Sequence, residues 1–334
     1  MIDLHLHLDG SLSEKDFINL AKKYNVDLTS DFPNNIYVPS DCPSLEEYLK
    51  RFDLPLLLLQ TKEALFEVSY NLVKRLHELG YIYAEIRFAP QLHTQKGLSQ
   101  LDAAKAALEG VNAAIKDYPD MEANLILCCM RHASEEVNME NIEVANKLKG
   151  TRVVAVDLAG AEAMHPSSYY SSIFDKAKQY GLNITIHAGE ATGSDEIMMA
   201  IDNGAKRIGH GVHLSLDEKS IKKVKDNDVC FEFCPTSNLQ TKSLKTYQDV
   251  PLKEFMKRDI PVTINSDNMT VSNTDVPLEM VHMVKTFNLT KEDIKSLLLT
   301  SIKYSFTDEK TKQVLKERLH QRIDSYYERL KKSA

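Results

Sequence analysis

The amino-terminal stretch reads Ile2-Asp3-Leu4-His5-Leu6-His7-Leu8-Asp9-Gly10, an alternating pattern typical of a β-strand that ends in a turn. Successive side chains of a strand point to opposite faces, so His5 and His7 would share one face and could bind one metal ion. The alternative is a pair of buried histidines whose ring nitrogens bond to backbone carbonyls. Further ligands elsewhere in the chain are needed to decide between these interpretations.

Seven more β-like runs follow, and most are separated by a segment of helical length. The eight runs are Ile2–Leu8, Ile82–Phe88, Ala123–Met130, Val153–Leu158, Asn183–His187, Arg207–Gly209, Val229–Phe233 and Val262–Asn265. Apolar residues at helical spacing predict helices at Lys62–Leu79, Leu98–Lys116, Val137–Leu148, Ser168–Tyr180 and Asp217–Lys225. This alternation predicts an α/β fold, a TIM (β/α)₈ barrel. A doubly wound open sheet would alternate similarly, but the barrel better explains the number of strands and the positions of the polar residues.

The chain has 334 residues, enough for one large barrel domain over residues 1–334. Residues 12–61 interrupt the alternation after the first strand and predict a helical insertion near the barrel mouth. Its helices would either partly cover the mouth or pack against the side of the barrel. Residues 308–334 are charged and amphipathic, which indicates a carboxy-terminal surface helix.

Composition narrows the class of partner. The net charge is −7 and no segment is strongly basic, which argues against nucleic acid as a partner. We expect neither a signal peptide nor a membrane span, because no apolar run is long enough. The five cysteines form no C-x-x-C pair and are odd in number, as expected in a reducing cytoplasm. The sequence therefore predicts a cytoplasmic, monomeric protein that acts on a small molecule.

Titratable residues gather at the ends of the β-like runs. His187 ends one run, His210 and Asp267 follow two others, and Glu190 lies three residues after His187. The carboxyl ends of barrel strands meet at one mouth, which is where barrel enzymes have their active sites. We therefore expect these side chains to lie close to the two histidines of the first strand.

Three imidazoles and one carboxylate are a ligand set that suits Zn²⁺ with one position open for water. The expected ligands are His5, His7, His187 and Asp267. His210 is then better placed as a base or hydrogen-bond partner of the water, and Glu190 as a proton donor or shuttle. Two-metal amidohydrolases commonly use a lysine at the end of the fourth strand. The run Val153–Leu158 contains none, so one zinc ion per chain is expected.

In combination and order, seven motifs resemble the adenosine deaminase family of metal-dependent hydrolases, in its bacterial form, over nearly the whole chain. The motifs span residues 5–12, 83–90, 127–132, 157–162, 187–190, 209–211 and 265–268. The resemblance implies a TIM barrel with one catalytic zinc. It also implies hydrolysis of adenosine and 2′-deoxyadenosine to inosine and 2′-deoxyinosine plus ammonia, in purine salvage.

The resemblance assigns each site residue a role. The zinc ligands would be His5, His7, His187 and Asp267. Water activated by the zinc would attack C6 of the purine while Glu190 protonates N1 and His210 orients and deprotonates the water. Substrate contacts would come from His7, from Asp9 to the ribose 5′-hydroxyl, from the Gly160 backbone N–H to N3, and from Asn268 to N7.

Two positions bear on substrate choice. Relatives that take free adenine often carry Glu at the position of Asp9, and the shorter Asp leaves room for a sugar. Many members carry a second Asp where this chain has Asn268, whose amide can donate to N7 at any pH; it could instead be a turn residue. A deaminase of a related 6-aminopurine, such as adenine or a modified adenosine, is the alternative enzyme. A non-catalytic purine-binding protein is the alternative from another class.

Overall fold

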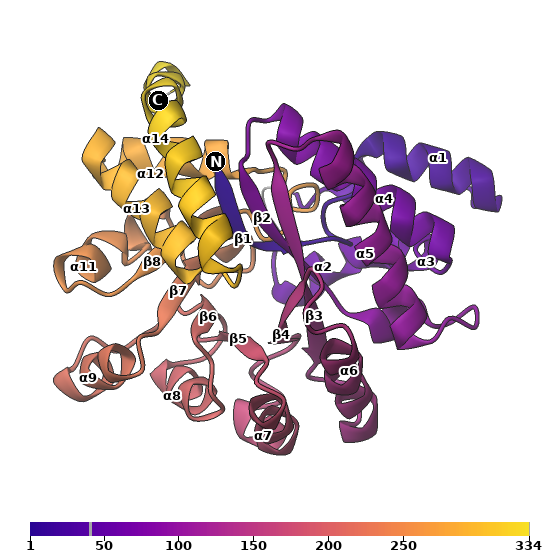
Figure 1. The fold of residues 1–334 in the computed structure, drawn as a ribbon, viewed down its shortest axis with the longest axis horizontal. Helices are drawn as coiled ribbons and strands as arrows, with labels where there is room; N and C mark the ends of the chain where they lie inside the picture. Colours follow the sequence, from indigo (N-terminus) through magenta and orange to yellow (C-terminus); the bar gives the residue numbers. More distant parts are fainter. Residues whose placement is uncertain (40–41, 334) are drawn as a thin grey trace.

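Eight parallel strands follow one another in chain order around a barrel (Figure 1). The computed structural model describes residues 1–39 and 42–333, leaving aside the side chains of residues 45 and 46. The strands are β1 (Ile2–His7), β2 (Tyr83–Phe88), β3 (Glu122–Met130), β4 (Val153–Ala159), β5 (Asn183–Ala188), β6 (Arg207–His210), β7 (Cys230–Phe233) and β8 (Val262–Ile264). Leu6 pairs with Asp267 just beyond β8, so the last strand meets the first. The predicted TIM barrel is confirmed.

Helices fill the connections between the strands. Five coincide with predicted segments to within a few residues: α4 (Lys62–Glu78), α5 (Gln100–Asp117), α6 (Glu135–Lys147), α7 (Ser171–Gln179) and α9 (Glu218–Asp226). The sequence analysis did not single out α8 (Ser194–Asp202), α10 (Pro235–Gln240), α11 (Leu252–Lys257), α12 (Val276–Phe287) and α13 (Lys291–Tyr304). Caps explain where the predicted helices begin: the Ser99 and Ser134 side chains accept the backbone N–H three residues on, at the starts of α5 and α6.

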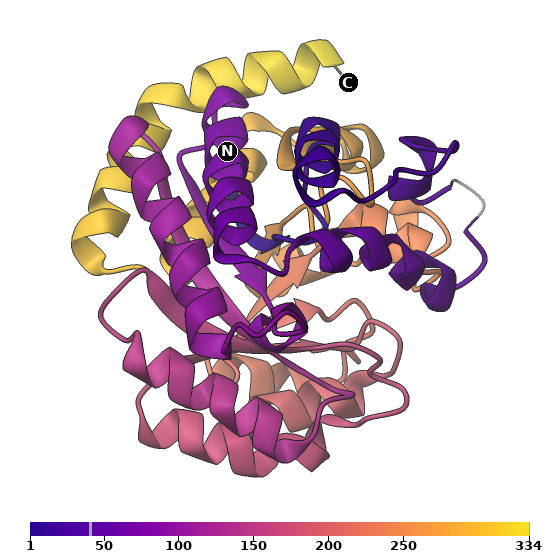
Figure 2. The same cartoon turned by 90° about the vertical axis from the view of Figure 1, so that its right-hand side faces the viewer.

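The segment after β1 is helical and lies over one side of the barrel (Figure 2). It contains α1 (Glu14–Tyr24), η1 (Asn34–Ile36), α2 (Leu45–Leu49), η2 (Lys50–Phe52) and α3 (Asp53–Leu58). The Val38 N–H bonds to the Val271 carbonyl at 2.8 Å, and the Tyr48 hydroxyl lies 2.8 Å from Ser272 Oγ. Gln60 Nε2 donates to the carbonyls of Leu56 and Leu92. These contacts attach both ends of α2–α3 to the strand-end loops.

The carboxy-terminal helix α14 (Glu309–Ser333) lies beside the start of β1 (Figures 1 and 2). It buries one apolar face, formed by Leu315, Leu319, Ile323, Tyr326 and Leu330. The Tyr326 hydroxyl and the Met1 amino group both donate to the Gly80 carbonyl, at 2.6 and 3.0 Å. The helix therefore covers the amino-terminal end of the barrel and leaves the opposite mouth to the loops. Among the described residues, no helix is both long and apolar enough to span a membrane.

Charged side chains occupy the barrel interior and are fully buried. Arg87 donates to Asp157 at 3.0 Å and to Glu232 at 2.9 Å. Arg207 donates to the other oxygen of Glu232 at 2.5 Å and lies 2.6 Å from Glu85. A buried charge is stable only when it is paired and hydrogen-bonded, and each of these groups meets that condition. The network joins β2, β4, β6 and β7 directly beneath the mouth.

Replacing one member of this network should be costly. Arg207→Met leaves Glu85 and part of Glu232 without their cation, so the free energy of unfolding should fall by about 3–5 kcal/mol. Arg152→Met makes the same change at a partly exposed pair, Arg152 with Glu122 at 2.8 Å, and should cost about 1 kcal/mol or less. Urea unfolding followed by circular dichroism measures both. Equal losses in the two variants would contradict the role assigned to the interior network.

Candidate functional site

Three histidines and one aspartate converge at the mouth of the barrel. One ligand atom from each of His5, His7, His187 and Asp267 lies within 4.8 Å of all the others. His5 and His7 lie on one face of β1 as predicted, while His187 comes from β5 and Asp267 from the turn after β8. All four are buried or nearly so. The structure therefore brings together the four residues that the sequence analysis proposed as metal ligands.

The spacing of these atoms matches a small tetrahedral ion. His7 Nε2 lies 3.3 Å from His187 Nε2, and Asp267 Oδ1 lies 3.4 Å from both His5 Nε2 and His7 Nε2. Ligands 2.0–2.1 Å from a tetrahedral Zn²⁺ are separated by about 3.3–3.4 Å. His5 Nε2 is buried and has no hydrogen-bond partner among the residues that the structure describes. The residues present therefore fit a zinc ion.

Buried carboxylates fix the orientation of two of the rings. Glu232 Oε2 lies 2.7 Å from His5 Nδ1, and Asp157 lies 3.0 Å from His187 Nδ1. A carboxylate that accepts from Nδ1 leaves Nε2 as the free lone pair, which is the usual arrangement of a metal-binding histidine. Burial alone would raise the pKa of Glu232, but Arg87 and Arg207 lower it well below its ordinary value. Glu232 therefore stays charged beneath His5.

The protonation states suit metal binding at two of the histidines. Burial lowers the pKa of His5 and lowers that of His7 well below its ordinary value, so both rings are neutral at neutral pH. Burial opposes ionisation of Asp267, but the neighbouring His5 outweighs it and the pKa of this carboxyl is lowered. His187 differs, because the Asp157 carboxylate outweighs burial and raises its pKa. A metal would have to displace a proton from His187 more often than from the other two.

A second cluster shares His5 and Asp267 and adds His210 and Cys234. Burial raises the pKa of the Cys234 thiol well above its ordinary value, and the thiol donates to the Glu232 carbonyl at 3.6 Å. A protonated thiol is a poor metal ligand. The set with three histidines and one aspartate is therefore the better metal site.

Two site residues have unusual backbones. Asp267 and His210 both adopt a φ of +62°, a region that residues other than glycine rarely adopt. Asp267 is held there by backbone hydrogen bonds to both histidine-bearing residues of β1, at 2.7 and 2.8 Å, and its Oδ2 accepts from Ser237 Oγ at 2.6 Å. Strained conformations that the surrounding structure maintains occur preferentially at functional sites.

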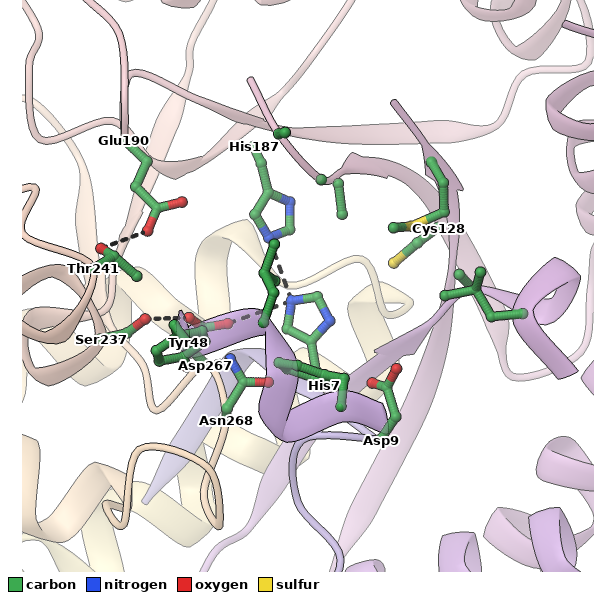
Figure 3. Close-up of a pocket in the computed structure, with 18 of the residues that line it drawn as sticks. His7, Asp9, Tyr48, Cys128, His187, Glu190, Ser237, Thr241, Asp267 and Asn268 are labelled. Atoms are coloured by element: carbon green, nitrogen blue, oxygen red, sulfur yellow. Dashed lines mark hydrogen bonds and ion pairs between the residues drawn. The ribbon is translucent and has the colours of Figure 1, made fainter. Parts of the chain in front are cut away.

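A pocket of about 340 Å³ opens above this cluster. Its apolar lining comes partly from the helical insertion and includes Leu49, Phe52, Leu56, Leu92 and Met130. Its polar lining includes Asp9, Gly160, Glu190, His210 and Asn268. In Figure 3, Glu190 and Asp9 appear on opposite sides of the His7–His187 pair. The pocket therefore offers apolar walls with polar groups at its floor and edges, as small-molecule sites commonly do.

Glu190 and His210 are neighbours in this pocket. Glu190 Oε2 lies 3.5 Å from His210 Nε2, and Glu190 Oε1 accepts from Thr241 Oγ1 at 3.1 Å. The His210 ring is held from behind by Asn238, whose Nδ2 lies 3.1 Å from Nδ1. The two groups that the sequence analysis proposed for proton transfer thus lie beside each other and close to the ligand cluster.

The three remaining predicted residues also line the pocket. Asp9 Oδ1 is buried and finds no hydrogen-bond partner within residues 1–39 and 42–333, and burial raises the pKa of this carboxyl to about 6. Gly160 has a φ of +107°, which favours glycine at this position. Asn268 donates one amide hydrogen to the Tyr48 hydroxyl at 2.8 Å, which the sequence analysis did not foresee. Its amide has a second N–H, so a contact with a ligand is still possible.

The sequence analysis gave no role to several residues that shape the site, although two of them, Asp157 and Glu162, lie in its motif at residues 157–162. They are Tyr48, Asp157, Glu162, Glu232, Ser237 and Thr241. Glu232 gave a usable signal, because a carboxylate inside the apolar run Val229–Phe233 must be paired if the run is a buried strand. Tyr48 gave none, since nothing in the insertion indicates which of its residues faces the pocket.

Comparison with known proteins agrees with this geometry. The family model for adenosine deaminase matches residues 1–322. The chain is 45% identical over 330 residues to an adenosine deaminase from Haemophilus ducreyi, and the match covers 96% of both proteins. Its fold is similar to that of an adenine deaminase from Arthrobacter aurescens, with a TM-score of 0.86, 23% identity and coverage of 97% of this chain and 98% of the other. An N6-methyl-AMP deaminase from Arabidopsis thaliana gives a TM-score of 0.84 at 25% identity, covering 97% and 96%. This chain belongs to the adenosine deaminase family.

Proposed function

We propose that this protein catalyses the zinc-dependent hydrolytic deamination of adenosine and 2′-deoxyadenosine, releasing ammonia. One observation carries the proposal. A group of side chains suited to bind zinc lies at the floor of a pocket, and the Glu190 carboxylate and the His210 imidazole lie side by side in the same pocket. The family assignment supports the same chemistry. We further propose a role in purine salvage; the monomeric state and the cytoplasmic location stay predictions from the sequence.

The proposed metal site is held by His5, His7, His187 and Asp267, with one ion per chain. When bound, zinc would supply a nucleophilic water at neutral pH. Asp267 contributes the one anionic ligand, and Ser237 fixes its second oxygen. His7 lines the pocket as well, so its ring can also contact the substrate.

Glu190 and His210 would divide the proton transfers between them. Attack at C6 of a purine requires a proton on N1, because otherwise the ring must carry the developing negative charge. Glu190 is the carboxyl group of the pocket that can donate this proton, and Thr241 positions it. His210, beside Glu190, orients the attacking water and accepts its proton.

The rest of the pocket suits a nucleoside. Asp9 has a buried oxygen without a partner, and a ribose 5′-hydroxyl would supply the missing donor. The backbone N–H of Gly160 can approach N3 of the base, since no Cβ intervenes. Asn268 can donate its second amide hydrogen to N7. The apolar walls accommodate the faces of the base.

A substrate panel tests the proposal. Adenosine and 2′-deoxyadenosine should lose absorbance at the adenine band and release ammonia, whereas adenine and AMP should react far more slowly. Zinc is measured on the same sample by atomic absorption. A preference for adenine would instead favour the adenine deaminase alternative and overturn the role of Asp9. Binding of purines without any turnover by the zinc-loaded protein would favour the non-catalytic alternative.

Glu190→Gln tests the proton donor. The amide cannot deliver a proton to N1, so kcat should fall by about 10²–10⁴-fold, the usual contribution of general acid–base catalysis. Zinc content and thermal midpoint should match those of the parent protein. A variant with near-normal turnover would remove Glu190 from this role.

Removal of the metal gives an independent prediction. A chelator should abolish activity, and added zinc should restore it. Protons compete with zinc for His187, whose pKa Asp157 raises against the effect of burial, so zinc affinity should fall as the pH is lowered. Competition with a chromophoric chelator at several pH values measures this dependence. A zinc affinity that does not change with pH would contradict the assignment of His187 as a ligand.

A further inference from the structure

One buried carboxylate outside the proposed reaction machinery accepts hydrogen bonds from four groups of a single loop. Glu162 Oε2 accepts from the backbone N–H of Glu190 at 3.1 Å and of Ala191 at 2.9 Å. Its Oε1 accepts from Thr192 Oγ1 at 2.6 Å and, at shorter range, from the backbone N–H of Gly189. The side chain is only 5% exposed, so these donors replace its water. Residues 189–192, in the loop between β5 and α8, thus surround the carboxylate of Glu162.

Glu162 itself belongs to a different loop, two residues beyond Gly160. That loop leaves the end of β4 and runs to η4 (Ser167–Tyr170). Gly160 and Glu190 both line the pocket. Gly160 lies two residues before Glu162, and the backbone N–H of Glu190 donates to the Glu162 carboxylate. The Glu162 carboxylate is therefore a direct link between the two loops that would face the ring nitrogens of the proposed substrate.

The link is strong and directional. Hydrogen bonds to an ionised group are roughly twice as strong as neutral ones, and the three successive backbone N–H groups form a concave binding surface for an anion. Arg131 reinforces the same region, because it donates to the His187 carbonyl at 2.7 Å and to Ser167 Oγ at 3.0 Å. Neither of those contacts reaches the backbone of Glu190. The Gly189–Glu190 peptide is held on one side by Glu162, which accepts the Glu190 N–H, and on the other by the His213 N–H, which donates to the Gly189 carbonyl at 3.2 Å.

We propose that Glu162 is a positioning residue for the deamination reaction: it sets the distance between the Gly160 N–H and the Glu190 carboxyl. This inference rests on the proposed function and deepens it. A purine ring fixes the separation of N1 and N3, so the groups that bind them must be held at a matching separation. Misplacement of a reacting group by about 1 Å can cost on the order of 10²-fold in rate.

A double-mutant cycle tests the link to Glu190. Glu162→Gln removes the charge and turns an amide NH₂ toward two of the four donors of the loop, so kcat/KM for adenosine should fall by about 10²-fold. In the Glu190→Gln background the same change should alter kcat/KM by no more than about 3-fold, because the group that it positions is already disabled. Equal losses in the two backgrounds would show that Glu162 acts independently of Glu190 and would overturn the proposal.

Glu196→Gln is the matched control. Glu196 is also buried, and its carboxylate accepts from the Ser167 N–H at 2.9 Å and lies 3.8 Å from Arg131. Within the part of the chain that the structure describes, this carboxylate accepts no hydrogen bond from residues 189–192, the four residues that Glu162 binds. Its effect on kcat/KM should be equal in the two backgrounds. If Glu162→Gln does not fold, Thr192→Val removes one of the four donors and should show the same non-additivity with a smaller loss. Additive behaviour of Thr192→Val would also contradict the proposal.

Two inhibitors test the link to Gly160. 1-Deazaadenosine and 1,3-dideazaadenosine both lack N1, so neither can be protonated there, and they differ only at N3. The ratio of their inhibition constants should fall toward one in Glu162→Gln and stay at the parent value in Glu196→Gln. An unchanged ratio in Glu162→Gln would remove Gly160 from the proposal. Absence of adenosine deamination in the parent protein would instead refute the proposed function itself, and that result is seen before any variant is made.

Discussion

The site depends on one buried carboxylate in the barrel interior. Glu232 accepts from four donors: His5 Nδ1 and Arg87 at one oxygen, Arg207 and Thr185 at the other. No water is needed to satisfy it, and no freedom is left in its orientation. Glu232 therefore orients the ring of His5 from inside the barrel. Asp157, which also contacts Arg87, orients the ring of His187 in the same way. Two of the four proposed metal ligands are thereby oriented in the structure without an ion.

The charges of the same network explain why a cation belongs above it. Two buried guanidiniums contact three carboxylates, those of Glu85, Asp157 and Glu232, and Asp267 adds a fourth carboxylate at the ligand cluster. The excess of negative charge equals the charge of one divalent ion. In a medium of low polarity such an excess is costly unless it is neutralised. The interior network thus both orients the ligands and favours occupation of the site by a divalent metal.

Local patterns in the sequence were sufficient to predict the barrel, the paired histidines of β1 and the position of Asp267 after the last strand. Each of these predictions depends on the alternation of apolar and polar residues or on the end of a β-like run, and residues that are neighbours in the sequence determine both. The partners of Glu232 and Glu162 could not be found in this way. Glu232 bonds to a residue 227 positions away, and Glu162 to groups 27–30 positions away, so both pairings exist only once the barrel closes and the loops fold. Length does not explain which helices were missed, because α7 and α9 have nine residues like α8 and were predicted, whereas the longer α12 and α13 were not singled out.

Two carboxylates, those of Glu232 and Glu162, each accept hydrogen bonds from four donors. Glu232 positions a side chain in the barrel interior, and Glu162 positions a loop. Glu232 holds a ring from beneath, through side chains that strands fix, whereas Glu162 holds a backbone segment from the side, through N–H groups of a loop. A barrel strand is hydrogen-bonded to a neighbour on each side, so a side chain that it carries is firmly held. Loop segments have few such constraints and generally open more easily than strands. Glu162 therefore restrains the loop that carries Glu190, much as the sheet restrains the proposed metal ligands of β1 and β5.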